Sequence, residues 1–137
     1  MRVLLDTNII MDALQERQPF DIAAKKILML GSTGKIDCHF MANAATDIFF
    51  LYSKARSMKE ANIALEFLLK TYKVVPITQE DCLKALALPN EDFEDSLVEV
   101  CAKKVNADYI ISRDEMFAKI ATVVKIIKPD DLISILN

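Results

Sequence analysis

The sequence has one histidine, three cysteines and no long apolar run, and each shortage excludes a class of protein. No stretch approaches the roughly 20 apolar residues that a membrane-spanning helix needs. The N-terminal segment MRVLLDTN has one basic residue, and Asp6 interrupts its short apolar stretch. This pattern lacks the features of a secretory signal peptide. We therefore expect a cytoplasmic protein with no membrane association.

The few cysteines suggest neither disulfides nor a zinc site. Cys38, Cys82 and Cys101 are odd in number and widely spaced, and each lies in an apolar segment. We expect buried, reduced thiols. His39 adds too few ligands for zinc. It lies in the segment CHFMA with no nearby nucleophile, which favours a structural role over a catalytic relay.

Positive charge is not in excess either. The net charge is -3 at pH 7, which excludes broad nonspecific binding of nucleic acid through overall charge. Any contact with RNA would be local. Hydrophobic residues make up 53% and charged residues 27%, as is typical of a well-filled globular domain. With no repeat, low-complexity segment or long linker, we expect a single domain over residues 1–137.

Short β-branched runs alternate with longer helical periodicities, a pattern typical of a parallel α/β sheet. The predicted fold is a three-layer α/β/α sandwich around a central, mainly parallel sheet of about five strands. Pro76 is expected near an edge strand or a strand end, and Asn43 could cap a helix. The predicted strands are residues 2–6, 38–42, 73–78, 107–112 and 122–129. The predicted helices are residues 20–35, stopping at Gly31 and Gly34, 43–72 with a break near Ser57, 79–88, 94–105 and 129–136.

Four acidic residues are predicted to meet at one edge of this sheet, beyond the carboxyl ends of the strands, where open α/β sheets bind ligands. Asp6 ends the first strand and Asp114 follows the fourth. Asp95 lies at the start of the helix before the fourth strand, and Asp47 in the first turns of the helix after the second. Clustered carboxylates repel one another unless a cation neutralises them, and oxygen ligands select Mg²⁺ or Mn²⁺. Such ions activate water for attack on a phosphodiester.

Each acidic residue also fits a local structural role: capping a helix, lying on a solvated helix face, or forming a surface turn. Only their joint placement favours a metal site. The capping role applies to Asp6-Thr7-Asn8, before a helix that starts near Ile9, and to Asp92 with Asp95; the helix-face role applies to Asp47 and the turn role to Asp114-Glu115.

Three segments, VLLDTNIIMD, NAATDIFFLYSK and DFEDSLVEVCAKKVNADYIISRDEMF, resemble the PIN domain in that family's order and usual separations. The resemblance covers essentially the whole chain. It implies a metal-dependent ribonuclease, similar to the toxin of VapBC toxin–antitoxin pairs. The family's acidic positions fall on Asp6, Asp47, Asp95 and Asp114, and its supporting polar positions on Thr7, Asn8 and Ser112.

The sequence departs from the family pattern at two places. Many members have Glu where this chain has Asp47, and the shorter side chain could move a metal ligand or require a bridging water. Many members also carry an Asp-Phe pair shortly after the fourth acidic position, where this chain has Met116-Phe117. Glu115 or Asp92 could substitute for the missing carboxylate.

The resemblance and the acidic edge together predict an endoribonuclease that uses Mg²⁺ or Mn²⁺. One alternative is a PIN-like domain without turnover that serves as a binding or scaffold module, which the shorter Asp47 would favour. A haloacid-dehalogenase-like phosphatase would need a second acidic residue where this chain has Asn8.

The predicted partners are RNA, an antitoxin and a second copy of the chain. If the protein is a toxin, an antitoxin segment should cover the acidic edge, with an Arg that pairs with the carboxylates. The apolar segments IFFLY and NIALEFLL could pack against a second copy in a homodimer. Basic residues that border the acidic edge could grip RNA, although solvated helix faces explain them equally well. They are Lys54, Arg56, Lys59 and Arg113.

Overall fold

A computed structural model describes all 137 residues and shows five parallel strands in one sheet, in the order β3-β2-β1-β4-β5. Because every neighbouring pair is parallel, all five strands end at the same edge. The prediction of a mainly parallel, five-stranded sheet is confirmed. The strands are β1 (Arg2–Leu5), β2 (Asp37–Met41), β3 (Lys73–Val75), β4 (Tyr109–Ile111) and β5 (Ile126–Ile127).

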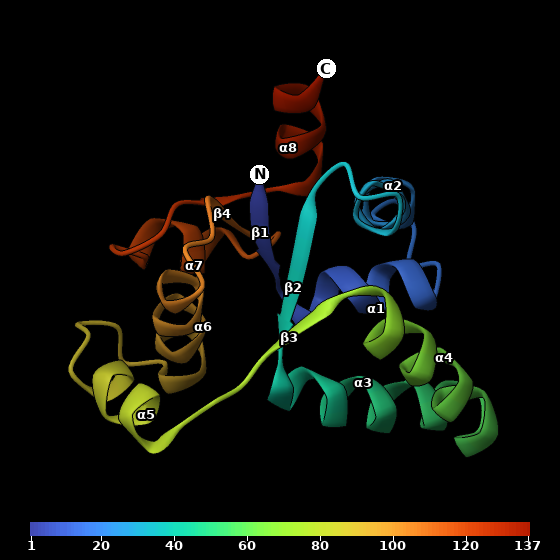
Figure 1. Cartoon of the computed structure of the whole chain (residues 1–137), viewed down its shortest axis with the longest axis horizontal. Coiled ribbons are helices and arrows are strands. Elements are labelled where there is room, and N and C mark those ends of the chain that lie inside the picture. The colour runs from blue at the N-terminus through green and yellow to red at the C-terminus, as the bar shows by residue number, and fades with distance from the viewer.

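Eight helices cover the two faces of this sheet, so the predicted three-layer sandwich is also confirmed. In Figure 1 the α3–α4 pair and the α5–α6 pair lie on opposite sides of the strands. One face carries α1 (Thr7–Leu14), α2 (Asp21–Ser32), α3 (Ala42–Ala55), α4 (Met58–Thr71) and α8 (Pro129–Leu136). The other face carries α5 (Gln79–Leu86), α6 (Phe93–Lys104) and α7 (Glu115–Ile120).

The alternation of side chains along the central strand creates a separate core on each face. Val3 and Leu5 point into the larger core, with residues of α1 to α4 and α8. Leu4, between them, points into the smaller core with residues of α5 to α7. All three are buried, which is why the first strand reads as a continuous apolar run. The run ends where the sheet ends, at Asp6.

Several element boundaries follow the sequence prediction. The break near Ser57 is confirmed, because the Ser57 side chain accepts a hydrogen bond from the Glu60 N–H and caps α4. Pro76 directly follows β3, which is an edge strand. The last two strands are shorter than predicted: β4 has three residues and β5 two.

Other boundary predictions were wrong. Asn43 does not cap α3, because the helix begins one residue earlier and Met41 holds the N-cap position. Gly31 does not end α2, which continues to Ser32. A Cβ atom at Gly31 would lie only 2.7 Å from the Cys38 Sγ atom, so glycine is needed there for close packing of the helix on β2. The helix considered near Ile9 is α1, which begins at Thr7, and α7 was not predicted.

The cysteines are free thiols, as predicted, and two of them are buried. Cys38 and Cys101 lie in the cores, where burial raises their thiol pKa values to about 12 and about 11. The prediction of burial was wrong for Cys82, which is partly exposed on α5. His39 is buried on β2, with its Nε2 atom 3.2 Å from a carboxylate oxygen of Asp37. No helix is long and apolar enough to cross a membrane.

Candidate active site

Asp6 is held at the carboxyl end of the central strand. Its N–H donates to the Ile111 carbonyl oxygen at 3.0 Å, which extends the pairing of β1 with β4 by one residue. It occupies the N-cap position of α1, but its side chain makes no capping hydrogen bond. The Ser112 hydroxyl instead donates to Asp6 Oδ2 at 2.8 Å. The capping role proposed for Asp6 is therefore not what fixes its carboxylate.

Ser112 links Asp6 to the second strand-end carboxylate. Its Oγ atom, which donates to Asp6, also accepts a hydrogen bond from the Asp114 N–H at 3.1 Å. Asp114 caps α7, because its Oδ1 atom accepts from the N–H groups of Met116 and Phe117, both at 3.1 Å. The predicted surface turn at Asp114 is thus the first turn of a short helix. Asp114 uses one carboxylate oxygen as a cap and keeps the other without a hydrogen-bond partner.

The helix α6 brings two further acidic side chains to the same edge of the sheet. Asp92 Oδ1 accepts a hydrogen bond from the Asp95 N–H at 3.1 Å, so the predicted capping role of Asp92 is confirmed. The Asp95 carboxylate caps nothing and is half-buried beside Asn90. The two residues therefore have different roles. Asp92 caps α6, whereas the Asp95 carboxylate interacts with the other carboxylates.

The pKa values show which carboxylates repel one another. Burial raises the pKa of Asp6 above its ordinary value, the Ser112 hydrogen bond opposes this rise, and the charge of Asp114 adds to it. Burial also raises the pKa of Asp95 to about 6, helped by the charges of Asp92, Asp114 and Asp6. Because such effects weaken steeply with distance, these four side chains share one region.

Glu94 also belongs to this region, and the sequence analysis missed it. Burial raises the pKa of Glu94, and the charges of Asp47, Asp92 and Asp6 raise it further. Asp47 is exposed on α3 and makes neither a hydrogen bond nor an ion pair. Its repulsion of Glu94 places it beside the acidic edge, across from α6. An acidic residue next to Asp95 in a first helical turn gave no separate signal, because acids are common there.

No basic side chain forms an ion pair with a member of this acidic cluster, which consists of Asp6, Asp47, Asp92, Glu94, Asp95 and Asp114. Ten ion pairs occur in the protein, and none of them includes a member of the cluster. Uncompensated carboxylates that raise one another's pKa favour the arrival of a cation. The donors are all hard oxygen atoms, and their chemistry fits a divalent ion such as Mg²⁺ or Mn²⁺.

The cluster is not, however, a closed ligand set. No three acidic, histidine or cysteine side chains are gathered closely enough to hold a metal ion as they stand. The expectation that topology alone would assemble a four-carboxylate metal site is therefore only partly met. The side chains share a region and lack a counter-charge, but they are spread along the edge of the sheet.

The remaining predicted residues lie around this cluster with different partners. Asn8 is exposed, and its Oδ1 atom accepts a 3.4 Å hydrogen bond from Arg17. Thr7 is half-buried and its side chain makes no hydrogen bond. Glu115 forms a 2.8 Å ion pair with Lys128, which lowers its pKa. The suggestion that Glu115 replaces the missing carboxylate is not supported, because no member of the cluster influences it.

The basic residues considered for RNA binding fall into two groups. Lys54 lies over the ring of Phe50, 4.5 Å from its centroid. Arg56 and Lys59 are exposed and form no ion pair. Arg113 differs from these three, because it is bound to the buried carboxylate of Asp12 and is not a free surface charge.

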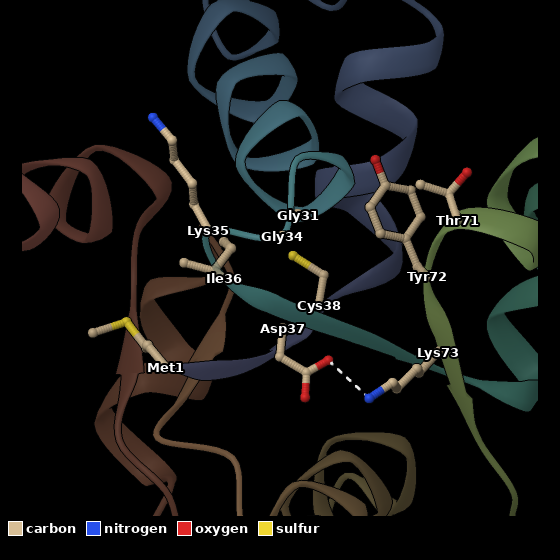
Figure 2. Close-up of a pocket in the computed structure, with 10 residues that line it drawn as sticks. All are labelled: Met1, Gly31, Gly34, Lys35, Ile36, Asp37, Cys38, Thr71, Tyr72 and Lys73. Atoms are coloured by element: carbon tan, nitrogen blue, oxygen red, sulfur yellow. Dashed lines mark ion pairs between the residues drawn. The ribbon is translucent and has the colours of Figure 1, made fainter.

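A cavity of about 300 Å³ lies at the opposite edge of the sheet, as Figure 2 shows. It opens beside the amino ends of β1, β2 and β3, where Met1, Asp37 and Lys73 line it. An ion pair of 3.5 Å between Asp37 and Lys73 lies along one side. This cavity is separate from the acidic cluster, which lies beyond the carboxyl ends of the strands.

Comparisons with known proteins identify the family of this chain. The model of the PIN domain matches residues 2–116. Ribonuclease VapC1 from Aquifex aeolicus (strain VF5) is 27% identical over 124 residues, which cover 85% of this chain and 83% of that protein.

Two solved structures share the fold at low sequence identity. A toxin–antitoxin complex from Klebsiella pneumoniae gives a TM-score of 0.69 at 19% identity, and covers 93% of this chain and 97% of that chain. VapC20 from Mycobacterium tuberculosis is described as a sarcin–ricin loop cleaving toxin. It gives a TM-score of 0.67 at 14% identity, and covers 85% of this chain and 93% of that chain. Since the family model spans most of the sequence, from β1 into α7, this chain belongs to the PIN domain family.

Proposed function

We propose that this protein is a divalent-metal-dependent endoribonuclease and the toxin of a toxin–antitoxin pair. One observation carries the proposal: six carboxylates without a basic partner at the carboxyl edge of a PIN-domain sheet. The relatives support it, because one is named a ribonuclease and another an RNA-cleaving toxin. Such a protein would act on RNA in the cytoplasm.

We assign Asp6, Asp95 and Asp114 to a Mg²⁺ or Mn²⁺ ion, with Asp47 acting through water. The metal would supply an activated water for attack on the phosphodiester and would offset the charge of the phosphate. The protein orients its own groups for this task. The Ser112 hydroxyl holds Asp6 Oδ2, and the N–H groups at the start of α7 hold Asp114 Oδ1. Glu94 joins the assignment as the carboxylate facing Asp47.

Asp95 gives the site a dependence on pH. With a pKa of about 6, its carboxylate is ionised in neutral solution and protonated in mild acid. An ionised Asp95 can hold a cation or accept the proton of an attacking water. Metal binding, and with it cleavage at limiting metal concentration, should therefore weaken as the pH drops through about 6, whereas an ordinary aspartate would keep its charge to about pH 4.

The proposed partners also follow from the surface. An antitoxin that covers the acidic edge would place a basic group, most simply an Arg, among carboxylates that lack one. The structural neighbour from Klebsiella pneumoniae is described as a toxin–antitoxin complex. A homodimer would use the α3–α4 face, where Phe50, Ile63 and Phe67 are each more than half exposed.

A metal titration combined with an RNA cleavage assay tests the function. The wild type should cleave single-stranded RNA with Mn²⁺ or Mg²⁺ and stop when EDTA is added. Asp6→Asn should abolish cleavage, while Asp130→Asn, a matched removal of an exposed carboxylate on α8, should keep it. If the wild type bound Mn²⁺ and RNA without cutting, the chain would instead be a PIN-domain binding module.

A further inference from the structure

The helix α1 carries a buried carboxylate that the acidic cluster does not use. Asp12 is fully buried, between apolar neighbours of the larger core. Arg113 binds it with two parallel hydrogen bonds, from Nε to Oδ2 at 2.8 Å and from Nη2 to Oδ1 at 3.1 Å. Arg17 adds a longer contact of 3.6 Å to Oδ1. A buried carboxylate with this bidentate partner is a fixed point in the structure.

Both partners of this pair lie next to members of the acidic cluster in the chain. Asp12 sits in α1, which begins directly after Asp6. Arg113 lies between Ser112 and Asp114. The pair therefore ties the helix that follows one strand-end aspartate to the turn that carries the other, across 101 residues of sequence.

Ser112 provides a second tie between the same two segments. Its hydroxyl joins Asp6 Oδ2 to the Asp114 N–H. The position of that hydroxyl depends on the backbone of the 112–114 turn, and the neighbouring Arg113 side chain is anchored to α1. Without the Asp12–Arg113 pair, the Ser112 hydroxyl would be the remaining side-chain tie between this turn and the segment that carries Asp6, beside the backbone hydrogen bond from the Ser112 N–H to the Ile127 carbonyl oxygen at 3.1 Å.

Arg113 is poorly placed to bind RNA directly. Two of its nitrogen atoms donate to Asp12, and its guanidinium lies over the ring of Phe20, 4.1 Å from the centroid. The charge of Asp12 neutralises it at close range. Its side chain is only one-third exposed, although it lines a cavity of about 660 Å³ between α2 and α8.

We propose that the Asp12–Arg113 ion pair positions Asp6 and Asp114 for catalysis, by fixing the 112–114 turn against α1. This inference rests on the proposed ribonuclease function. Asp12 and Arg113 are positioning residues, since Asp12 is fully buried and Arg113 uses two of its nitrogen atoms to bind it. A displacement of about 1 Å in a catalytic group can cost roughly 100-fold in rate, so loosening the turn should appear mainly in kcat.

The experiment compares two single variants of this pair with two matched controls. Asp12→Asn and Arg113→Gln remove one partner each. Asp81→Asn and Lys104→Gln do the same to the pair that joins α5 to α6, which also combines a buried Asp with a partly exposed base. For each protein we would measure kcat and KM on a fluorogenic RNA at saturating Mn²⁺. Mn²⁺ affinity by calorimetry and the melting temperature complete the set.

We expect Asp12→Asn and Arg113→Gln each to lower kcat by about 10-fold or more, with KM changed by less than about 3-fold. Mn²⁺ affinity should fall by several fold in both. The two control variants should lose a similar amount of melting temperature and keep kcat and Mn²⁺ affinity near the wild-type values. If Arg113→Gln does not fold, Arg113→Lys replaces it in the experiment. This variant keeps the charge but loses the bidentate contact with Asp12, and should show the same loss of kcat.

Two results would overturn the inference. An increase in KM alone for Arg113→Gln, with Asp12→Asn unaffected, would make Arg113 an RNA contact. Equal losses of kcat in the test and control variants would leave the pair a purely structural one. A wild type that cleaves no RNA would refute the proposed function instead, and the calorimetric Mn²⁺ affinities would still report whether the pair positions the carboxylates.

Discussion

Asp95 should make the protein less stable than it would be with a neutral side chain at that position. Replacement by Asn keeps the shape of the side chain and removes its charge. We expect Asp95→Asn to raise the melting temperature at neutral pH and to abolish RNA cleavage. The first effect follows from the environment of the carboxylate, and the second from its place in the proposed metal site.

The size of the stability gain can be worked from the pKa. Burial and the charges of Asp92, Asp114 and Asp6 raise the pKa of Asp95 from 3.8 to about 6. Two pH units correspond to about 3 kcal/mol against the ionised form. Because the carboxylate is half-buried and solvent screens it, we expect about 1 kcal/mol. The nearby helix N-terminus favours the ionised form and opposes this effect, so about 1 kcal/mol is an upper value. A gain of this size raises the melting temperature by about 3 to 5 °C.

The effect has a defined dependence on pH. Between pH 3.8 and about 6 the unfolded chain loses this proton before the folded protein does. The folded state then binds more protons, so the stability of the wild type falls as the pH rises through this window. The difference between the variant and the wild type should therefore be absent near pH 4 and complete above about pH 7.

Thermal unfolding at low ionic strength, followed at both ends of this range, measures the effect. Asp81→Asn is the control of opposite sign, because its ion pair with Lys104 lowers the pKa of Asp81. That variant should be less stable than the wild type at neutral pH, and the difference should shrink in acid. A lower melting temperature for Asp95→Asn at neutral pH would refute the reasoning, and would indicate that Asp95 acts chiefly as a helix-end charge.

Three further predictions concern the other carboxylates and the thiols. Asp6→Asn should leave the circular dichroism spectrum unchanged while cleavage disappears; a cleaving variant would remove Asp6 from the metal site. Asp47→Ala should weaken Mn²⁺ binding less than Asp6→Asn does, and Asp47→Glu should keep or improve cleavage, whereas wild-type behaviour of Asp47→Ala in both assays would make this residue an ordinary surface acid. With a thiol reagent under native conditions, Cys82 should react first and without loss of cleavage, because burial and raised pKa values protect Cys38 and Cys101; early labelling of either buried thiol would contradict this.

Local patterns predicted the architecture well because the main elements are long and strongly periodic. The apolar run before Asp6 indicated the central strand, and the alternation of runs and helices gave the parallel sheet. The errors fell on helix ends and short strands, whose limits are set by contacts between elements. Gly31 is a packing residue of α2 rather than its end, because a Cβ atom there would meet Cys38, and β5 has two residues because only Ile126 and Ile127 pair with β4.

The residues of the candidate site were predictable where strand topology determines their position. They were not predictable where contacts between side chains distant in sequence determine it. Asp6, Asp95 and Asp114 reach one edge because parallel strands end together. Glu94 was missed because two of its neighbours, Asp47 and Asp6, come from other segments. Asp12 was missed for the same reason, since nothing in the apolar stretch IIMDAL shows that Arg113, 101 residues later, will bind it.

The central position of β1 determines when the protein can become active during its synthesis. The ribosome makes β1 first, but β1 pairs with both β2 and β4. The strand β2 follows after some 30 residues, whereas β4 is made near the end of the chain. Until β4 and the following turn emerge, Asp6 has no Ser112 partner and Asp114 does not exist. Contacts this distant in sequence form late because their loops are costly to close. A nascent toxin of this topology would remain harmless to the RNA around it until the last fifth of the chain has been made.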